Sequence, residues 1–248
     1  MFIFNPKAIV LHAKIKVMLD TLLSEIKINI NEGLFLKDPE SSELGIEILF
    51  NSVVLLDELG FEQFTFKKLA QKIKSTESSI YRYFENKHKL LLYLCALYWG
   101  MLEYRLVLAT NSIESDTKRL LKAVDLITGP PENINTLTKV NQLLLRNIVV
   151  SEFTKAYHNK MVDDENKSGF FQIYKRLILR VVEMIKQVNP NYAYPNSLAS
   201  TIIDGALHQH YLKEHFKKIT DGDNSTPSLF FKDMVINQLK IDTNGRTK

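Results

Sequence analysis

Residues 64–87 read FTFKKLAQKIKSTESSIYRYFENK, and this stretch predicts two short helices joined by a tight turn. The first helix begins at Thr65, whose hydroxyl can accept a hydrogen bond from a backbone N–H of the first turn. The apolar residues that follow recur at intervals of three and four, as one face of a helix requires: Phe66, Leu69, Ala70 and Ile73. Lys74-Ser75-Thr76 supplies the turn and a second cap, and the next helix buries Ile80 and Phe84.

The side chains that this arrangement leaves outside are polar and mostly basic. The first helix turns Lys67, Lys68 and Lys72 outward. The second presents Ser78, Ser79, Arg82 and one or both of Tyr81 and Tyr83. A short helix of this kind fits the major groove of DNA with its N-terminal residues at base edges, while the helix before it crosses the phosphate backbone. The pattern therefore predicts a DNA-binding surface.

The same residues resemble a known family. Phe-Thr-x-x-x-Leu-Ala, followed by Ser-Ile-Tyr-Arg-Tyr-Phe-x-Asn-Lys, is similar to the N-terminal helix-turn-helix of the tetracycline-repressor (TetR) family, over residues 44–98. The resemblance implies an all-α protein whose DNA-binding domain has three helices and the start of a long fourth. It places the first helix at Leu44–Leu59 and makes Asn86 the cap of the fourth.

The resemblance also implies a role for each matching residue. Thr65 and Lys67 would hold phosphates, and the residues facing the groove would be Thr76, Glu77, Ser78, Ser79 and Arg82. Tyr81 and Tyr83 would reach phosphates or base edges, and Lys87 would hold a phosphate from the first turn of the fourth helix. Arg82 is the best candidate for guanine, because a guanidinium can bond O6 and N7 together. The alternative is that the lysines are a solvated face and the tyrosines are structural.

One position departs from the family pattern. Lys74 stands where the family usually has glycine. If the turn needs a positive φ, a lysine there costs about 1 kcal/mol.

Composition agrees with a DNA-binding protein. The 248 residues are 45% hydrophobic, enough for one domain of about 50 residues and another of about 150. The net charge is only +4, but residues 61–90 concentrate the basic side chains, with Lys67, Lys68, Lys72, Lys74, Arg82, Lys87 and Lys89 against Glu62, Glu77 and Glu85. Residues 41–60 carry four acids, Glu43, Glu47, Asp57 and Glu58, and no base. Binding to DNA is then expected to weaken steeply with salt.

The cellular setting is expected to be the cytoplasm, without a membrane partner. The only cysteine, Cys95, excludes an intramolecular disulfide and lies in an apolar run that suggests a core position. The sequence holds no run of 18 apolar residues, and the first 23 residues are interrupted by charges, which argues against a spanning helix or signal peptide.

Three regions are predicted: an extension over 1–43, the helix-turn-helix domain over 44–98, and a helical domain over 99–248. In the first, Ile26–Ile30 alternates with period two and 34–37 follows a turn, which favours a small hairpin or an extended arm. A loosely ordered extension is the alternative, and Met18 is a possible second start. Beyond Asn86 we expect helices at 87–109, 114–128, 134–158, 168–188, 195–219 and 227–241.

Two of these helices are candidates for dimerisation. A single recognition helix reads few base pairs, so selective binding to a palindromic operator needs two copies. Helices 168–188 and 195–219 each carry an apolar stripe, and the last long helices form the dimer in the resembling family. Tight packing within one chain is the alternative reading of the same stripes.

The resemblance implies an effector pocket in the helical domain, for an apolar or amphipathic small molecule. Its candidate lining residues are aromatic: Trp99, Tyr104, Phe153, Tyr157, Phe171 and Tyr174. Aromatic residues at helical spacing are also ordinary core, which is the alternative. We predict no catalytic residue, cofactor or metal site, because no nucleophile elbow, phosphate loop or Cys-x-x-Cys occurs.

Two candidate functions are consistent with the sequence. The favoured one is a dimeric, one-component transcription regulator, most simply a repressor that releases its operator when an effector binds. The other is an all-helical protein-interaction or ligand-carrying module that keeps the helix-turn-helix only as a fold.

Overall fold

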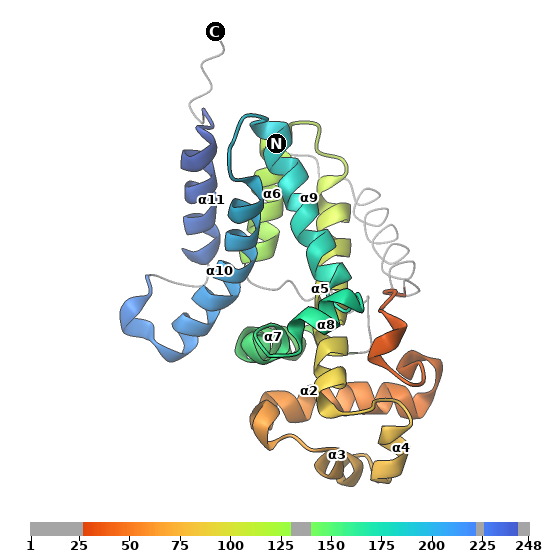
Figure 1. The fold of residues 1–248 in the computed structure, drawn as a ribbon. Helices are drawn as coiled ribbons and strands as arrows, with labels where there is room; N and C mark the ends of the chain where they lie inside the picture. Colours follow the sequence, from red (N-terminus) through yellow and green to blue (C-terminus); the bar gives the residue numbers. More distant parts are fainter. Residues whose placement is uncertain (1–26, 130–139, 222–225, 243–248) are drawn as a thin grey trace, which may run out of the picture.

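The computed structural model describes residues 27–129, 140–221 and 226–242, and this part of the chain is helical without strands (Figure 1). The DNA-binding domain occupies one end of the molecule. It consists of α2 (Glu43–Gln63), α3 (Phe66–Lys72), α4 (Glu77–Tyr81) and the first turn of α5 (Lys87–Thr110). The expected first helix at Leu44–Leu59 is therefore confirmed and runs slightly longer. Gly60, with φ of 71°, breaks its last turn.

Helix α5 joins this domain to the helical body. Asn86 caps it as expected, with its side-chain oxygen accepting from the Lys89 N–H at 2.9 Å. By length and composition alone α5 qualifies as a membrane span, but 78% of its apolar window is buried inside the protein. It is therefore a core helix. Cys95 is fully buried on it, as predicted, and burial raises the pKa of its thiol to about 12.

The body packs around the far half of α5. Its helices are α6 (Asp116–Thr128), α7 (Gln142–Tyr157), α8 (Val162–Lys167), α9 (Gln172–Val188), α10 (Pro195–His215) and α11 (Thr226–Leu239). These bounds agree with the expected segments with three differences. Helix α8 lies in the expected gap between 158 and 168, α9 begins only at Gln172, and 195–219 ends in a separate 3₁₀ turn, Lys217–Ile219. The start of the expected 134–158 helix lies outside the described residues. Helix α11 packs on α6 and beside α10 (Figure 1).

The predicted N-terminal hairpin is wrong for the described residues. Residues 27–31 are extended, but two 3₁₀ turns follow, Glu32–Leu34 and Pro39–Ser41, in place of a second strand. The Asn31 side chain caps the first turn by accepting from the Gly33 N–H at 2.8 Å. Ile28 and Ile30 are both buried, and Ile28 packs against α5, where a Cβ on Gly100 would lie 2.3 Å from it. Burial against a helix thus replaces strand pairing. Met18 and residues 1–26 lie outside the described residues.

Candidate DNA-binding surface and effector cavity

Helices α3 and α4 are placed by side-chain caps and one strained turn. Thr65 caps α3 by accepting from the Lys68 N–H at 3.2 Å, and Thr76 caps α4 by accepting from the Ser79 N–H at 3.3 Å. Between them Lys74 adopts φ of 53°, the left-handed conformation that glycine tolerates best. The expected turn strain at Lys74 is therefore present.

The polar side chains predicted for DNA contact mostly lie on the outside. Those exposed are Thr65, Lys67, Thr76, Glu77, Ser78, Tyr81 and Arg82, and Ser79 is half-buried. Tyr81 is 48% exposed and packs edge-on against Phe66, with ring centroids 5.0 Å apart. Beneath them the apolar face of the two helices is closed by Leu69, Ile80 and Phe84, all fully buried. The surface is thus a polar layer on a rigid apolar base, and its contacts with DNA stay a prediction.

Tyr83 does not suit the contact role that the resemblance implies, because its side chain points inward. It is only 3% exposed, and its hydroxyl lies 2.8 Å from Ser42 Oγ. Lys37 Nζ donates to the same hydroxyl at 3.4 Å, and the Leu36 N–H donates to the Tyr83 carbonyl at 2.8 Å. The hydrogen bond from Ser42 lowers the pKa of Tyr83, against the effect of burial. Tyr83 therefore anchors residues 36–42 to the domain, which was the structural alternative for this residue.

Lys87 is also engaged within the protein. Its Nζ donates to the carbonyls of Phe61 at 2.8 Å, Glu62 at 3.3 Å and Phe64 at 3.3 Å. The ammonium also lies 4.5 Å from the centre of the Phe61 ring. A cation at the C-terminus of a helix satisfies carbonyls that have no partner in the helix and complements its dipole. Lys87 thus closes the end of α2, and its predicted phosphate contact is not supported by this geometry.

The predicted aromatic residues do meet, but they fill their own space. Trp99, Phe153, Tyr157, Phe171 and Tyr174 form one cluster, in which Phe153 and Tyr157 stack with centroids 4.6 Å apart. Trp99 Nε1–H donates to the Tyr157 hydroxyl at 2.8 Å. Tyr174 O–H donates to Asp204 Oδ1 at 2.6 Å, while burial raises the pKa of both groups. Tyr104 is half-buried further along α5. The cluster has the geometry of a core, the alternative reading of these residues.

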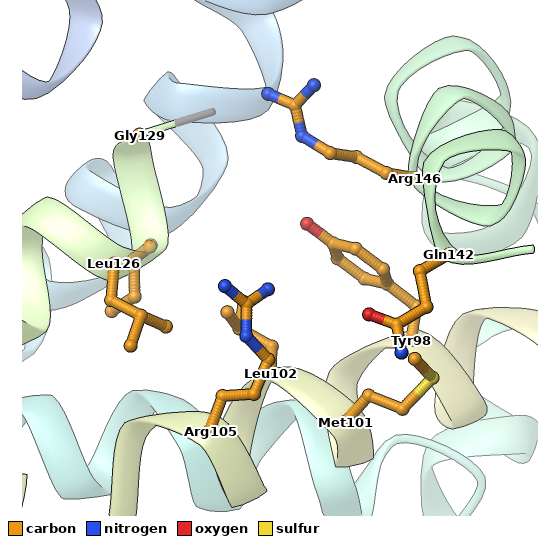
Figure 2. A pocket seen from close by; sticks show the side chains of 9 residues that line it. Tyr98, Met101, Leu102, Arg105, Leu126, Gly129, Gln142 and Arg146 are labelled. Atoms are coloured by element: carbon orange, nitrogen blue, oxygen red, sulfur yellow. The ribbon is translucent and has the colours of Figure 1, made fainter. Parts of the chain in front are cut away.

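A small cavity of about 30 Å³ lies instead among α5, α6 and α7 (Figure 2). Its polar lining residues are Tyr98 and Arg105 from α5 and Gln142 and Arg146 from α7. Apolar side chains complete the lining: Met101, Leu102, Leu126 and Ile127. The sequence analysis did not predict this cavity. The available signal was a single arginine within each of two apolar runs, around Arg105 and around Arg146.

His210 lies next to the cavity. Its Nε2 lies 3.0 Å from the Thr128 carbonyl at the end of α6. Burial and the positive charges of Arg146 and Lys213 lower the pKa of His210 to about 4. His210 is therefore neutral at pH 7, so that Nε2–H donates to Thr128. A neighbourhood that disfavours a third positive charge is already electropositive.

Several contacts connect the body to the DNA-binding domain. Glu152 of α7, buried, accepts from the Phe61 N–H at 3.0 Å, just after the break at Gly60. Asn147 of the same helix donates to Asp57 at 3.1 Å. His88 Nε2 lies 2.6 Å from Glu165 Oε1, which joins α5 to α8. Movement of α7 would therefore be transmitted directly to α2.

Comparison with known proteins agrees with this geometry. Residues 48–94 match a family model described as "Bacterial regulatory proteins, tetR family". A crystal structure of AibR in complex with isovaleryl coenzyme A and operator DNA superposes with a TM-score of 0.54 at 15% identity, covering 75% of this chain and 95% of that one. The structure of apo AibR gives a TM-score of 0.47 at 15% identity, covering 76% and 95%.

No match is found among curated proteins. The family match covers α2, α3 and α4, and it includes the capped turn between α3 and α4. Residues 48–94, which hold the helix-turn-helix, are thus similar to the tetR family of bacterial regulatory proteins.

Proposed function

We propose that this protein is a dimeric, sequence-specific DNA-binding regulator of the cytoplasm, and that it is a repressor released from its operator by a small molecule. The observation that carries the proposal is the outer face of α3 and α4. There, exposed hydroxyls and cations stand on a rigid base at the free end of the molecule (Figure 1). The narrow helix α4 can then enter the major groove.

Within this surface the proposed roles differ by chemistry. Arg82 reads guanine, and Thr76, Glu77, Ser78 and Ser79 approach base edges from the first turn of α4. Thr65, Lys67 and Tyr81 hold phosphates, which fixes the register but carries no sequence information. The exposed ammonium groups of Lys68, Lys72 and Lys74 add to the positive electrostatic potential of this surface. The contribution of Lys72 is reduced by Glu58, which lies 3.7 Å away.

The dimer is proposed to form through α10 and α11, so that α11 replaces α9 of the predicted pair. The exposed face of α9 is charged, with Lys175, Arg176, Arg180, Glu183 and Lys186. The end of α10 and the start of α11 instead expose large apolar side chains, 52% to 68% accessible: Phe216, Ile219, Leu229 and Phe230. Exposed apolar side chains of this size are what the centre of a homodimer interface requires, and the exposed Lys217 and Lys218 between them would lie at its rim.

A pair of matched substitutions tests this interface. Phe230 on α11 and Leu179 on α9 are equally exposed, at 54% and 55%. We expect Phe230→Lys to give monomers in sedimentation velocity, while Leu179→Lys stays dimeric. The reverse result would return α9 to the interface.

An effector-bound state is supported by two features. The crystal structure of AibR contains both isovaleryl coenzyme A and operator DNA, so a protein of this fold binds both classes of partner. In this chain, α7 lines the cavity through Arg146 and contacts α2 through Asn147 and Glu152. An effector that favours one position of α7 therefore changes the affinity for DNA. It does so because it binds the DNA-binding conformation and the released conformation with unequal affinity.

A mobility-shift assay tests the function as a whole. The DNA fragments are those that adjoin the protein's own gene, with a scrambled fragment of equal composition as the control. We expect selective, salt-sensitive binding to one palindromic fragment. Absence of selective binding at any salt concentration would favour the alternative, a helical interaction or ligand-carrying module with the helix-turn-helix as a fold only.

A further inference from the structure

The cavity among α5, α6 and α7 combines two guanidinium groups with a mostly apolar wall. Figure 2 shows the Arg105 side chain entering from α5 and the Arg146 side chain lying across from it on α7, with the Tyr98 hydroxyl between them. None of the described residues that line the cavity is a carboxylate. Two positively charged side chains therefore border a small space, and the described residues that line it supply no carboxylate.

Arg146 carries the stronger sign of a missing ligand. Its Nη2 is buried and has no hydrogen-bond partner in the described part of the chain. Arg146 also forms a side-chain hydrogen bond with Tyr98, which leaves Nη2 as the unpaired group. An unpaired buried donor is destabilising, so an acceptor that reaches Nη2 would gain a favourable hydrogen bond. The charge of Arg146 also contributes to keeping neighbouring His210 neutral, which is consistent with a site that attracts anions.

We propose that this cavity binds the oxyanion group of the effector, and that the effector is a small organic acid. Arg105 and Arg146 would hold the oxyanion, a carboxylate or a phosphate monoester, because the guanidinium fork matches both geometries. A short apolar chain would follow Leu102, Leu126 and Ile127. The cavity of about 30 Å³ has room for the head group, so a longer chain requires these side chains to move.

This inference rests on the proposed function, since it names the class of molecule that releases the operator. Binding of the oxyanion would shift the Arg146 side chain and, with it, helix α7. The same helix holds α2 through Asn147, the next residue, and through Glu152. A shift of α7 would therefore displace α2, the helix that supports α3 and α4.

The test is a calorimetric titration of the full chain without DNA. Hexanoate and hexyl phosphate are the two oxyanion probes, and hexanamide is the uncharged control. We expect at least one oxyanion to bind at least tenfold more tightly than hexanamide, and the better of the two identifies the acid. Arg146→Met should weaken that binding at least tenfold, whereas Lys175→Met, the same change of charge on the exposed face of α9, should not alter it.

Thermal unfolding provides a readout that does not depend on the probe. Methionine keeps the apolar stem of Arg146 and removes the buried charge, so Arg146→Met should raise the apo Tm by about 2–4 °C if it relieves ~1 kcal/mol. A lower Tm would show that Arg146 is structural and would overturn the proposal. The proposal would also be overturned if hexanamide bound as tightly as the oxyanions, or if neither oxyanion bound. Unchanged binding of the oxyanion by the Arg146→Met variant would overturn it as well.

The two proposals fail separately. A protein that binds an operator selectively but fails the titration keeps the regulatory function and loses the oxyanion cavity. A protein that binds hexanoate or hexyl phosphate through Arg146 but no operator keeps the cavity and loses the regulatory function.

Discussion

Arginine occurs in two opposite settings in this molecule, at the end of α4 and in the cavity of the body. Arg82 is exposed, so its charge is hydrated and its presence costs the fold little. Arg146 has a buried Nη2 with no hydrogen-bond partner in the described part of the chain, and an unpaired buried donor weakens the fold. An exposed cation is thus available to any polyanion, while a buried one selects what fits beside it.

The largest effect is expected from the aromatic cluster of the body. Trp99 is 1% exposed and donates its N–H to Tyr157. Trp99→Ala should lower the free energy of unfolding by about 3–5 kcal/mol, because the removed ring leaves a large cavity. Urea denaturation measures the loss. A change below ~1 kcal/mol would mean that the cluster is an open pocket after all, as the sequence first suggested.

The next effect concerns the exposed arginine. Arg82→Ala should cost about 1–3 kcal/mol of binding to the operator and relax the preference at one base pair. Lys67→Ala is the matched control, since it should weaken all sequences alike and lower the salt slope by about 0.9. Fluorescence anisotropy over a salt series gives both quantities. Uniform losses in both variants would assign Arg82 to a phosphate.

Lys87 is intermediate between Arg82 and Arg146 in burial, and its ammonium is hydrogen-bonded within the protein. Lys87→Met removes the donor from three carbonyls at the end of α2, so the free energy of unfolding should fall by about 1–2 kcal/mol. The salt slope of DNA binding should stay unchanged. If the slope instead falls by about one with stability intact, Lys87 does contact a phosphate.

A smaller and opposite effect is expected at the turn. Lys74→Gly should raise the free energy of unfolding by up to about 1 kcal/mol, since glycine adopts φ of 53° without steric cost. Lys72→Gly, at the last position of α3, should instead lower it by about 1 kcal/mol. Differential scanning calorimetry distinguishes the two. A destabilised Lys74→Gly would indicate a role for the lysine side chain.

The smallest effect at neutral pH involves His210. Its pKa is about 4 in the folded protein and about 6.5 when unfolded, so the unfolded state binds more protons between these values. Stability due to His210 is complete above pH 6.5 and is lost as the pH falls toward 4. His210→Gln keeps a donor to Thr128, and it should flatten the dependence of the unfolding free energy on pH in that window. A parallel pH profile would show that His210 does not titrate there.

Local patterns predicted the DNA-binding domain well. The caps at Thr65, Thr76 and Asn86 and the apolar spacing through Ile80 and Phe84 act within a few residues, so they are legible without a tertiary structure. The hairpin prediction at 26–37 failed because alternation alone does not say whether a strand or a helix covers the buried face. Ile28 packs against α5 at Gly100, a helix rather than a second strand.

The sequence by itself determined the all-α fold and the polar outer face of α3 and α4, because helix periodicity and capping are short-range. Tertiary structure alone decided which chemically similar side chains stay free. It turned Tyr81 outward and Tyr83 inward to Ser42, and it directed Lys87 to the end of α2. It also brought Arg105 and Arg146, 41 positions apart in the chain, to one cavity. The physical reason is that a side chain's partner depends on which distant backbone packs beside it, and no local pattern encodes that neighbour.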